Sequence, residues 1–318
     1  MTSSTESIFS NPSVFRINEN NEYLVIGILY SLVALSVFPI YLPVVYAIRT
    51  KSEFKDNVSY KLISLLNFCD LLQSSCQILT GIFIVFPVFA EKIDPFITGY
   101  TLNTLWLASF VLIAVLSMTR LAVTFFNFKA NRWTLWMKII LFFGGLYIFT
   151  IWIFGCVTLN FRLDGVAWAY DPNAPFVDIL GPMEIYFCFP IMVFNFISFI
   201  LILGNIYKKK RGTQSSSSLR TEVSLLTQTI VLTTYMATIM LLWHHGDSWF
   251  EMTNVAVALL NGSWIMFSHL NALLLILTNR TVRRQVALLL CGSCTSSRIN
   301  SFKASTVMDM RRPSNIVT

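Results

Sequence analysis

Asp70 is the ionisable residue that lies deepest in an apolar part of the sequence, about three helical turns into the segment 60–89. If this segment crosses a bilayer, placing a carboxylate there costs about 3 kcal/mol on insertion scales, so its presence needs an explanation. One interpretation is a protonated or hydrogen-bonded structural residue. The other is a switch between helices that is linked to a cation or a proton.

Arg120 and Asn271 are two further polar residues inside apolar segments. Arg120 can extend its guanidinium to the lipid head groups at the end of its segment, or it can face the interior of a helix bundle. Ser109 precedes Arg120 by about three turns, so the two residues share nearly the same helix face. Asn271 lies late in the last apolar segment, one turn after Ser268.

Four residues in the apolar segments are candidates for the lining of a ligand pocket, namely Asn103, Trp106, Trp243 and Trp264. The three tryptophans can equally be packing or interfacial residues, because amphipathic rings are frequent in both places. His244, His245 and His269 are interpreted as hydrogen-bonded packing residues rather than ligands.

An intramembrane enzyme would need paired carboxylates, a Ser/His pair or a metal cluster at one depth. Asp70 has no acidic partner in another apolar segment, and no His/Cys cluster has zinc spacing apart from Cys291 and Cys294. We interpret that pair as lipidation candidates rather than half of a metal site. The sequence therefore predicts no catalytic residues and no metal centre.

The composition of the chain indicates a membrane protein. Of its 318 residues 55% are hydrophobic and 12% are charged, and the mean hydropathy is +0.65. A soluble domain carries roughly 25% charged residues, so too little polar surface remains to cover a water-soluble globule. The net charge of +7 does not indicate nucleic-acid binding, because the basic residues stand between the apolar segments.

Seven apolar segments are long enough to cross a bilayer, which needs about 20 residues. They are 23–48, 60–89, 98–126, 135–159, 179–206, 223–243 and 253–277. The first 22 residues contain no apolar signal region, so we expect the first segment to direct the chain to the membrane. The fold class is thus predicted to be an all-α seven-transmembrane bundle, with residues 279–290 forming a short amphipathic eighth helix on the inner membrane face.

The distribution of Lys and Arg predicts the orientation, because cytoplasmic loops are rich in them. Of the 23 basic residues, 20 lie in or beside the loops after segments 1, 3 and 5 or in the C-terminal tail; the exceptions are Arg16, Lys92 and Arg162. We therefore expect an extracellular N-terminal segment at 1–22, a seven-transmembrane domain with the eighth helix at 23–290 and a disordered cytoplasmic tail at 291–318. The outer side is acidic, which we interpret as a solvated surface, with attraction of cationic ligands as the alternative.

Together, Asp70, Arg120 and Asn271 in their segments resemble a rhodopsin-like G-protein-coupled receptor. The stretches that begin at Ser59 and at Leu79, and the residues Trp168-Ala-Tyr-Asp-Pro, resemble the nematode serpentine chemoreceptors, class T first and class X next.

The resemblance implies a role for most of these candidate residues. Asp70, Ser109, Ser268 and Asn271 would form a cation and switch site with a sodium ion near Asp70, Arg120 would face a heterotrimeric G protein, and Cys291 and Cys294 would be palmitoylated.

The sequence also departs from the receptor pattern. Thr119 replaces the acid before the arginine, Ala272 and Leu275 replace the proline and tyrosine of the NPxxY motif, and segment 6 lacks the CWxP element. The cysteine expected at the outer end of segment 3 is absent, and with it the disulfide to the second outer loop.

The predicted function is a chemosensory receptor in the plasma membrane that binds a small molecule among the outer helix halves and signals to a G protein. The alternative is a ligand-gated channel or a small-molecule transporter. A transporter usually shows internal repeats or matched Gly/Pro-broken helices, which this sequence lacks. A retinal-binding pump is excluded because the last segment has no Lys for a Schiff base.

Overall fold

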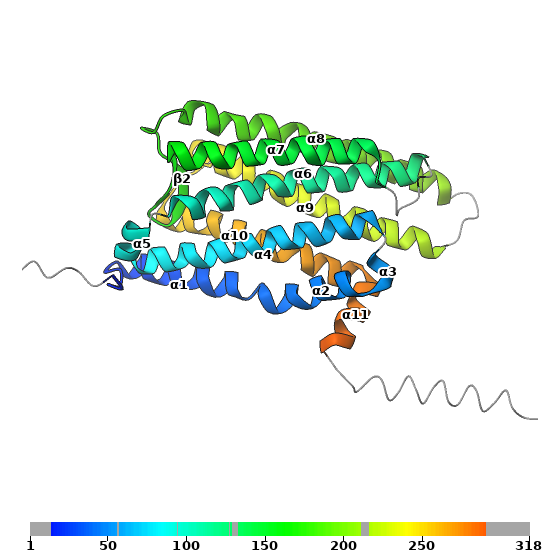
Figure 1. The fold of residues 1–318 in the computed structure, drawn as a ribbon, viewed down its shortest axis with the longest axis horizontal. Helices are drawn as coiled ribbons and strands as arrows, with labels where there is room; N and C mark the ends of the chain where they lie inside the picture. Colours follow the sequence, from blue (N-terminus) through cyan, green and yellow to red (C-terminus); the bar gives the residue numbers. More distant parts are fainter. Residues whose placement is uncertain are drawn as a thin grey trace, which may run out of the picture.

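The computed structural model describes residues 14–55, 57–93, 95–126, 128, 133–210 and 216–290. Within this part of the chain, seven helical segments are long and apolar enough to cross a membrane, which confirms the predicted bundle (Figure 1). They are Asn21–Thr50 (α1, Asn21–Leu35, and α2, Phe38–Thr50), α4 (Val58–Val85), α6 (Phe96–Phe126), α7 (Leu135–Thr158), α8 (Val177–Lys210), α9 (Ser216–Trp249) and α10 (Asn254–Thr278).

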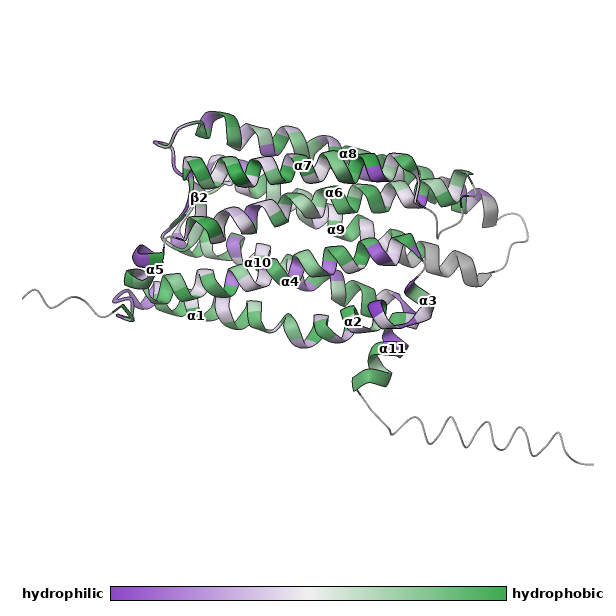
Figure 2. Ribbon diagram, in the orientation of Figure 1, coloured by the Kyte–Doolittle hydropathy of each residue, from purple (hydrophilic) through white to green (hydrophobic). Residues whose placement is uncertain are grey.

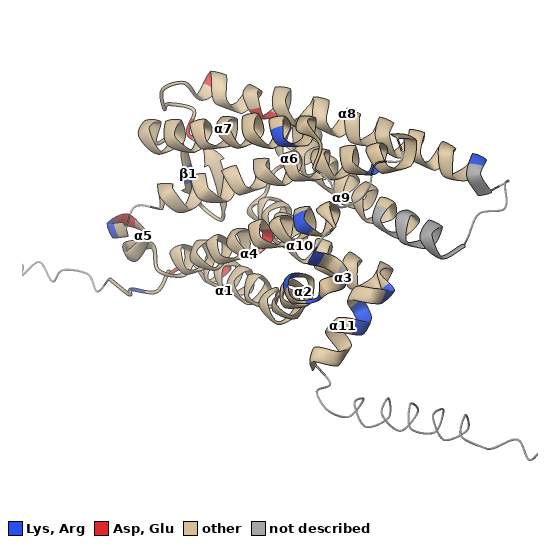
Figure 3. Cartoon of the chain, turned by 45° about the vertical axis from the view of Figure 1, so that its right-hand side comes forward, with Lys and Arg blue, Asp and Glu red and all other residues tan. Residues whose placement is uncertain are grey.

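Short elements close the two ends of the bundle. β1 (Phe161–Asp164), β2 (Ala167–Tyr170) and α5 (Pro87–Ile93) lie at one end, which we call the hairpin end. The other end, which we call the α11 end, carries α3 (Ser52–Lys55) and α11 (Arg280–Leu290) (Figure 1). Figure 3 shows Lys and Arg gathered around α11.

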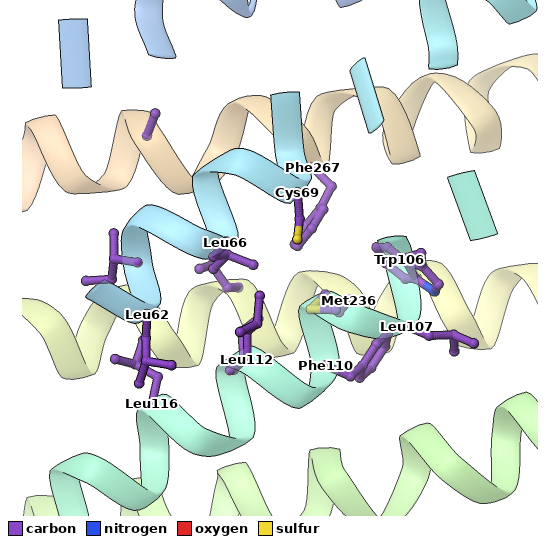
Figure 4. Close-up of a cluster of buried hydrophobic side chains, with 14 of the residues drawn as sticks. Leu62, Leu66, Cys69, Trp106, Leu107, Phe110, Leu112, Leu116, Met236 and Phe267 are labelled. Atoms are coloured by element: carbon purple, nitrogen blue, oxygen red, sulfur yellow. The ribbon is translucent and has the colours of Figure 1, made fainter. Parts of the chain in front are cut away.

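The helices differ strongly in burial. In α6, 67% of the most apolar stretch is buried, against 11% in α7, so α6 is central and α7 is peripheral. The hydrophobic colouring of α7 and α8 in Figure 2 continues on their outer faces, where Phe142, Phe143 and Phe149 are exposed. Such faces suit contact with lipid. The interior contains Leu66 of α4, Leu112 of α6 and their neighbours (Figure 4).

The first spanning helix is interrupted between α1 and α2. Pro39 has no amide hydrogen, so it cannot bond to the carbonyl of the preceding turn. His269 of α10 lies against this interruption, with its Nε2 3.0 Å from the carbonyl of Val33 and 3.0 Å from the hydroxyl of Ser36. His269 is therefore a hydrogen-bonded packing residue in the structure.

Most boundaries differ from the sequence prediction by a few residues, and those of the second and sixth spanning helices have a clear physical reason. The second spanning helix ends at Val85 rather than at residue 89, because Pro87 starts the separate helix α5. The sixth begins at Ser216 and continues through His244 and His245 to Trp249, seven and six residues beyond the predicted ends. Polar residues there prolong the helix although they lower the hydropathy on which the prediction relied.

A β-hairpin between α7 and α8 was not predicted, so the all-α description holds for the bundle but not for this connection. The strands pair antiparallel from Phe161 opposite Tyr170 to Asp164 opposite Ala167. Gly165 begins the two-residue turn with a φ of +58°, which glycine adopts without steric cost.

The predicted eighth helix is present as α11. Asn279 terminates α10 and caps α11, because its Oδ1 accepts hydrogen bonds from the amides of Thr281 and Val282 at 3.0 and 3.1 Å. Its amide nitrogen donates to the Tyr60 hydroxyl at 2.6 Å. Val282 and Val286 are buried, which leaves the charged side of α11 exposed.

Candidate functional site: a cavity, a polar network and a buried arginine

A cavity lies between α6, α8, α9 and α10 at the hairpin end. All four predicted pocket residues line it, together with residues that the prediction did not include. The lining consists of Asn103, Trp106, Phe161, Glu184, Cys188, Ile239, Met240, Trp243, His244 and Trp264. The cavity volume is about 30 Å³, room for roughly two water molecules.

The tryptophans of the cavity pack on one another as well as lining it. The rings of Trp106 and Trp243 each meet Trp264 edge-on, with centroids 5.7 and 5.6 Å apart. Trp106 also contacts Phe110 and Phe267, which connect the cavity floor to the core (Figure 4). The two interpretations of these residues, packing and pocket lining, are thus compatible.

Glu184 forms the polar side of the cavity. Its Oε1 accepts hydrogen bonds from the Asn103 side-chain amide at 2.5 Å and from the Tyr170 hydroxyl at 2.7 Å. Its Oε2 lies 3.7 Å from Nε2 of His244. The acidic outer side was predicted to be a solvated surface, but the side chain of Glu184 is only 13% exposed. The sequence offered one signal, the position of Glu184 two turns inside an apolar helix.

Tyr170 brings the hairpin into this site. Burial, with a further contribution from the charge of Glu184, raises the pKa of the Tyr170 phenol well above its ordinary value. The phenol therefore remains a hydrogen-bond donor to Glu184 over the physiological range.

Trp168 anchors the hairpin to the bundle. Its side chain is fully buried, and its indole nitrogen donates a hydrogen bond to the Thr80 hydroxyl at 2.9 Å. The ring stacks on Phe161 and occupies the space above Gly99, where a Cβ atom would lie 2.4 Å from it. The described cysteines, Cys69, Cys76, Cys156 and Cys188, are free thiols. Packing of Trp168 thus holds the hairpin without a disulfide from the described part of the chain.

Asp70 lies at the centre of a buried polar network. Its Oδ2 accepts hydrogen bonds from the Tyr41 hydroxyl at 2.9 Å and from the Asn271 side-chain amide at 3.1 Å. Asn271 also donates to Asn67 at 2.6 Å and accepts from Gln228 at 2.7 Å. The network joins α2, α4, α9 and α10, and the prediction had included only Asp70 and Asn271 of these five residues.

Ser109 and Ser268 stand apart from that network. Ser109 accepts a hydrogen bond from Gln73 at 3.4 Å, and Gln73 in turn accepts one from Trp264 at 3.3 Å. Ser268 is buried on α10, but neither serine is hydrogen-bonded to Asp70 in the described residues. Gln73, one turn along α4 from Asp70, thus bridges Trp264 of the cavity and Ser109 of α6.

Arg120 is enclosed near the α11 end of the bundle. It is 8% exposed and lines a cavity of about 10 Å³ with side chains from α8 and α9, including Asn195, Thr229 and Thr233. Thr119, in the place of the expected acid, donates to the carbonyl of Val115 at 2.7 Å. Arg120 therefore lies among polar residues of α8 and α9, and the residue before it in the chain is a threonine rather than an acid.

Two further predictions concern the tail cysteines and a metal centre. Cys291 and Cys294 lie outside the described residues. In the described part of the chain, no three His, Cys, Asp or Glu side chains are placed to hold a metal ion.

Comparison with known proteins identifies the family. No curated protein gives a significant match to the chain. The sequence profile described as "Serpentine type 7TM GPCR chemoreceptor Srt" matches residues 6–300, which include all seven spanning helices, the hairpin and α11. This confirms the resemblance to class T, and it is a family of receptors rather than enzymes. The chain is therefore a multi-pass membrane protein that belongs to the Srt family of serpentine 7TM GPCR-type chemoreceptors.

Proposed function

We propose that this chemoreceptor binds a small molecule in the cavity at the hairpin end and signals to a heterotrimeric G protein at the α11 end. The observation that carries the proposal is the cavity itself, since four spanning helices and the hairpin meet there. A concave, mostly apolar site with a few convergent polar groups is the usual form of a small-molecule pocket.

The proposed orientation places the hairpin end outside the cell and the α11 end in the cytoplasm of a plasma-membrane receptor. Basic side chains at the α11 end support it, among them Lys55, Lys138, Lys208 and Arg284. Cytoplasmic loops of membrane proteins carry such an excess of Lys and Arg. We also retain Cys291 and Cys294 as lipidation candidates, because they directly follow the amphipathic helix α11.

Signalling in this proposal requires movement of α9 relative to α6 and α10. Arg120 on α6 is enclosed by α8 and α9, and a G protein can contact it only if these helices separate at the α11 end. Gln228 connects α9 to Asn271 of α10. A ligand that binds the open arrangement more tightly shifts the population towards it.

A sodium ion near Asp70 is part of the proposal. Asp70 Oδ1 and the Ser74 hydroxyl are buried oxygens without a hydrogen-bond partner in the described residues. They lie one turn apart on the same face of α4. Oxygen ligands of this kind suit a hard cation, which would bind here and stabilise the closed network.

Loss of Arg120 tests the signalling mechanism. Ligands found in a screen of the intact receptor are assayed in parallel for G-protein nucleotide exchange and for membrane current. We expect ligand-stimulated exchange to fall at least about tenfold in Arg120→Ala, a loss of roughly 1.4 kcal/mol of coupling free energy. Lys138→Ala, an exposed basic residue at the same end, is the matched control and keeps its activity.

Two results would contradict the proposal. Full exchange activity in a surface-expressed Arg120→Ala receptor would remove the assigned role of the arginine. A ligand-evoked current in cells without any G protein would instead favour the channel alternative.

A further inference from the structure

The charge of the cavity indicates what kind of ligand it accepts. Glu184 is the one carboxylate among the described lining residues, and no Lys or Arg is among them. His244 is the lining residue that can carry a positive charge, and its Nε2 lies 3.7 Å from Glu184 Oε2, beyond hydrogen-bond distance. Arg162 of the hairpin is paired with Asp171 at 2.9 Å and lines another part of the surface.

The two carboxylate oxygens of Glu184 have different roles. Oε1 is held by two neutral donors, the amide of Asn103 and the phenol of Tyr170, which also contact each other at 3.1 Å. These bonds fix the orientation of the carboxylate without neutralising its charge. Oε2 accepts no hydrogen bond from the described residues, and the side chain is partly open to solvent. Glu184 Oε2 is thus a negatively charged acceptor that an entering molecule can reach and that no described cation neutralises through a hydrogen bond.

Aromatic rings form a large part of the remaining lining. Trp106, Trp243, Trp264 and Phe161 line the same cavity as Glu184. The faces of such rings attract organic cations, most strongly in the case of tryptophan. A carboxylate that shares a cavity with tryptophan side chains therefore combines two features that both favour positive charge.

We propose that the cavity selects small organic monocations, with the ammonium group at Glu184 Oε2 and the apolar part of the molecule against the tryptophans. This inference rests on the proposed function, because it names the ligand class of the same cavity. An anionic ligand would meet the charge of Glu184 with only His244 to offset it. A neutral ligand would leave the carboxylate charge unpaired in a mostly apolar site.

The size of the cavity adds a condition. About 30 Å³ holds roughly two waters, so a ligand must displace side chains as well as water. His244 and Trp243 are partly buried neighbours on α9, and both line the cavity. Their displacement by an ammonium group would act directly on the helix that encloses Arg120.

The test uses the full-length receptor in nanodiscs of neutral lipid. The probes are butylamine, benzylamine and 2-phenylethylamine, each with the alcohol and the carboxylate of matching size. The Kd comes from the dependence of thermal stability on probe concentration. We expect at least one amine to bind the wild type about ten- to a hundredfold more tightly than its alcohol, since charged hydrogen bonds contribute about 1.5–3 kcal/mol.

Glu184→Gln removes the charge but keeps an oxygen that can accept from Tyr170 and Asn103. We expect it to lose that preference while affinity for the alcohols changes less than about threefold, because their binding does not depend on the charge. Asp178→Asn, an exposed acid on the same helix, is the matched control and keeps the preference.

The inference is overturned if no amine exceeds its alcohol in the wild type, a result that needs no variant. It is also overturned if Glu184→Gln keeps the preference. If the alcohols bind as tightly as the amines, the proposed ligand class is refuted, but the proposal that the cavity binds a small molecule stands. Loss of Arg120 dependence would instead refute the proposed signalling and leave amine binding untouched.

Discussion

Replacing Trp168 tests whether one buried side chain holds the hairpin over the cavity. Trp168→Ala removes a fully buried ring that stacks on Phe161 and fills the space above Gly99. Truncations of buried tryptophans cost about 3–5 kcal/mol, from lost transfer free energy and from the cavity that remains. We expect a loss of stability in this range, together with weaker ligand binding, because Phe161 and Tyr170 belong to the same hairpin.

Two milder substitutions separate the contribution of the hydrogen bond to Thr80 from that of the packing against Gly99. Trp168→Phe keeps an aromatic ring but loses the bond to Thr80, whose hydroxyl still donates to the carbonyl of Cys76 at 3.0 Å. We expect a cost of about 1 kcal/mol from this bond, with an additional packing term. Gly99→Ala keeps the indole but places a methyl group 2.4 Å from it, and overpacking of this kind costs about 1–3 kcal/mol.

Gly145→Ala is the matched control for Gly99→Ala. Both glycines lie in spanning helices, but a Cβ at Gly145 meets no atom within 4 Å. We expect this variant to be neutral or stabilised by up to about 1 kcal/mol, the difference in helix propensity between glycine and alanine.

The assay exploits the buried free thiols of Cys69, Cys76 and Cys188. A thiol-reactive fluorophore reports their exposure as the purified receptor is heated. Equal melting of Trp168→Ala and wild type would refute the anchoring role of the indole. Equal melting of the two glycine variants would refute the steric argument.

Two remaining predictions concern the polar sites. Sodium, compared with potassium at equal ionic strength, should stabilise the wild type by about 1 kcal/mol at a concentration of roughly five times its Kd. Asp70→Asn should abolish this difference, and melting temperatures in the two salts measure both effects. Equal stability of the wild type in sodium and in potassium would contradict a sodium site. Because the pKa of Tyr170 is raised in the folded protein, the stability it contributes is complete below pH 10 and is lost as pH rises further. Tyr170→Phe should therefore lose less stability than the wild type between pH 9 and about 11, and parallel curves for the two proteins would show that the phenol does not contribute.

Much of the bundle follows from the sequence because membrane insertion imposes a simple rule. A segment of about 20 apolar residues must be helical to satisfy its own backbone in lipid. The prediction was wrong where that rule does not apply. A helix ends before Pro87 although the apolar run continues, and α9 continues past His244 although the residues there are polar. The hairpin that follows Leu159 was not predicted at all.

The candidate sites show the same division. Asp70 and Arg120 were recognisable because an ionisable group in an apolar segment is costly wherever the helices lie. Tyr41, Gln73 and Gln228 were not, since polar uncharged residues are frequent in such helices and their partners are distant in sequence. Glu184 could not be told apart from the acids of a solvated outer surface, because a carboxylate two turns into an apolar helix suits either environment.

By itself, the sequence determined that seven segments cross a membrane and that a carboxylate, an arginine and an asparagine lie within them. These properties are local, because they depend on residue type and on spacing along one helix. Only the tertiary structure decided that Glu184 shares a cavity with three tryptophans, that Gln73 bridges Trp264 and Ser109, and that Arg120 is enclosed by α8 and α9. Such contacts join helices far apart in the chain, so they depend on how the bundle packs and on the hairpin that Trp168 fixes across its end.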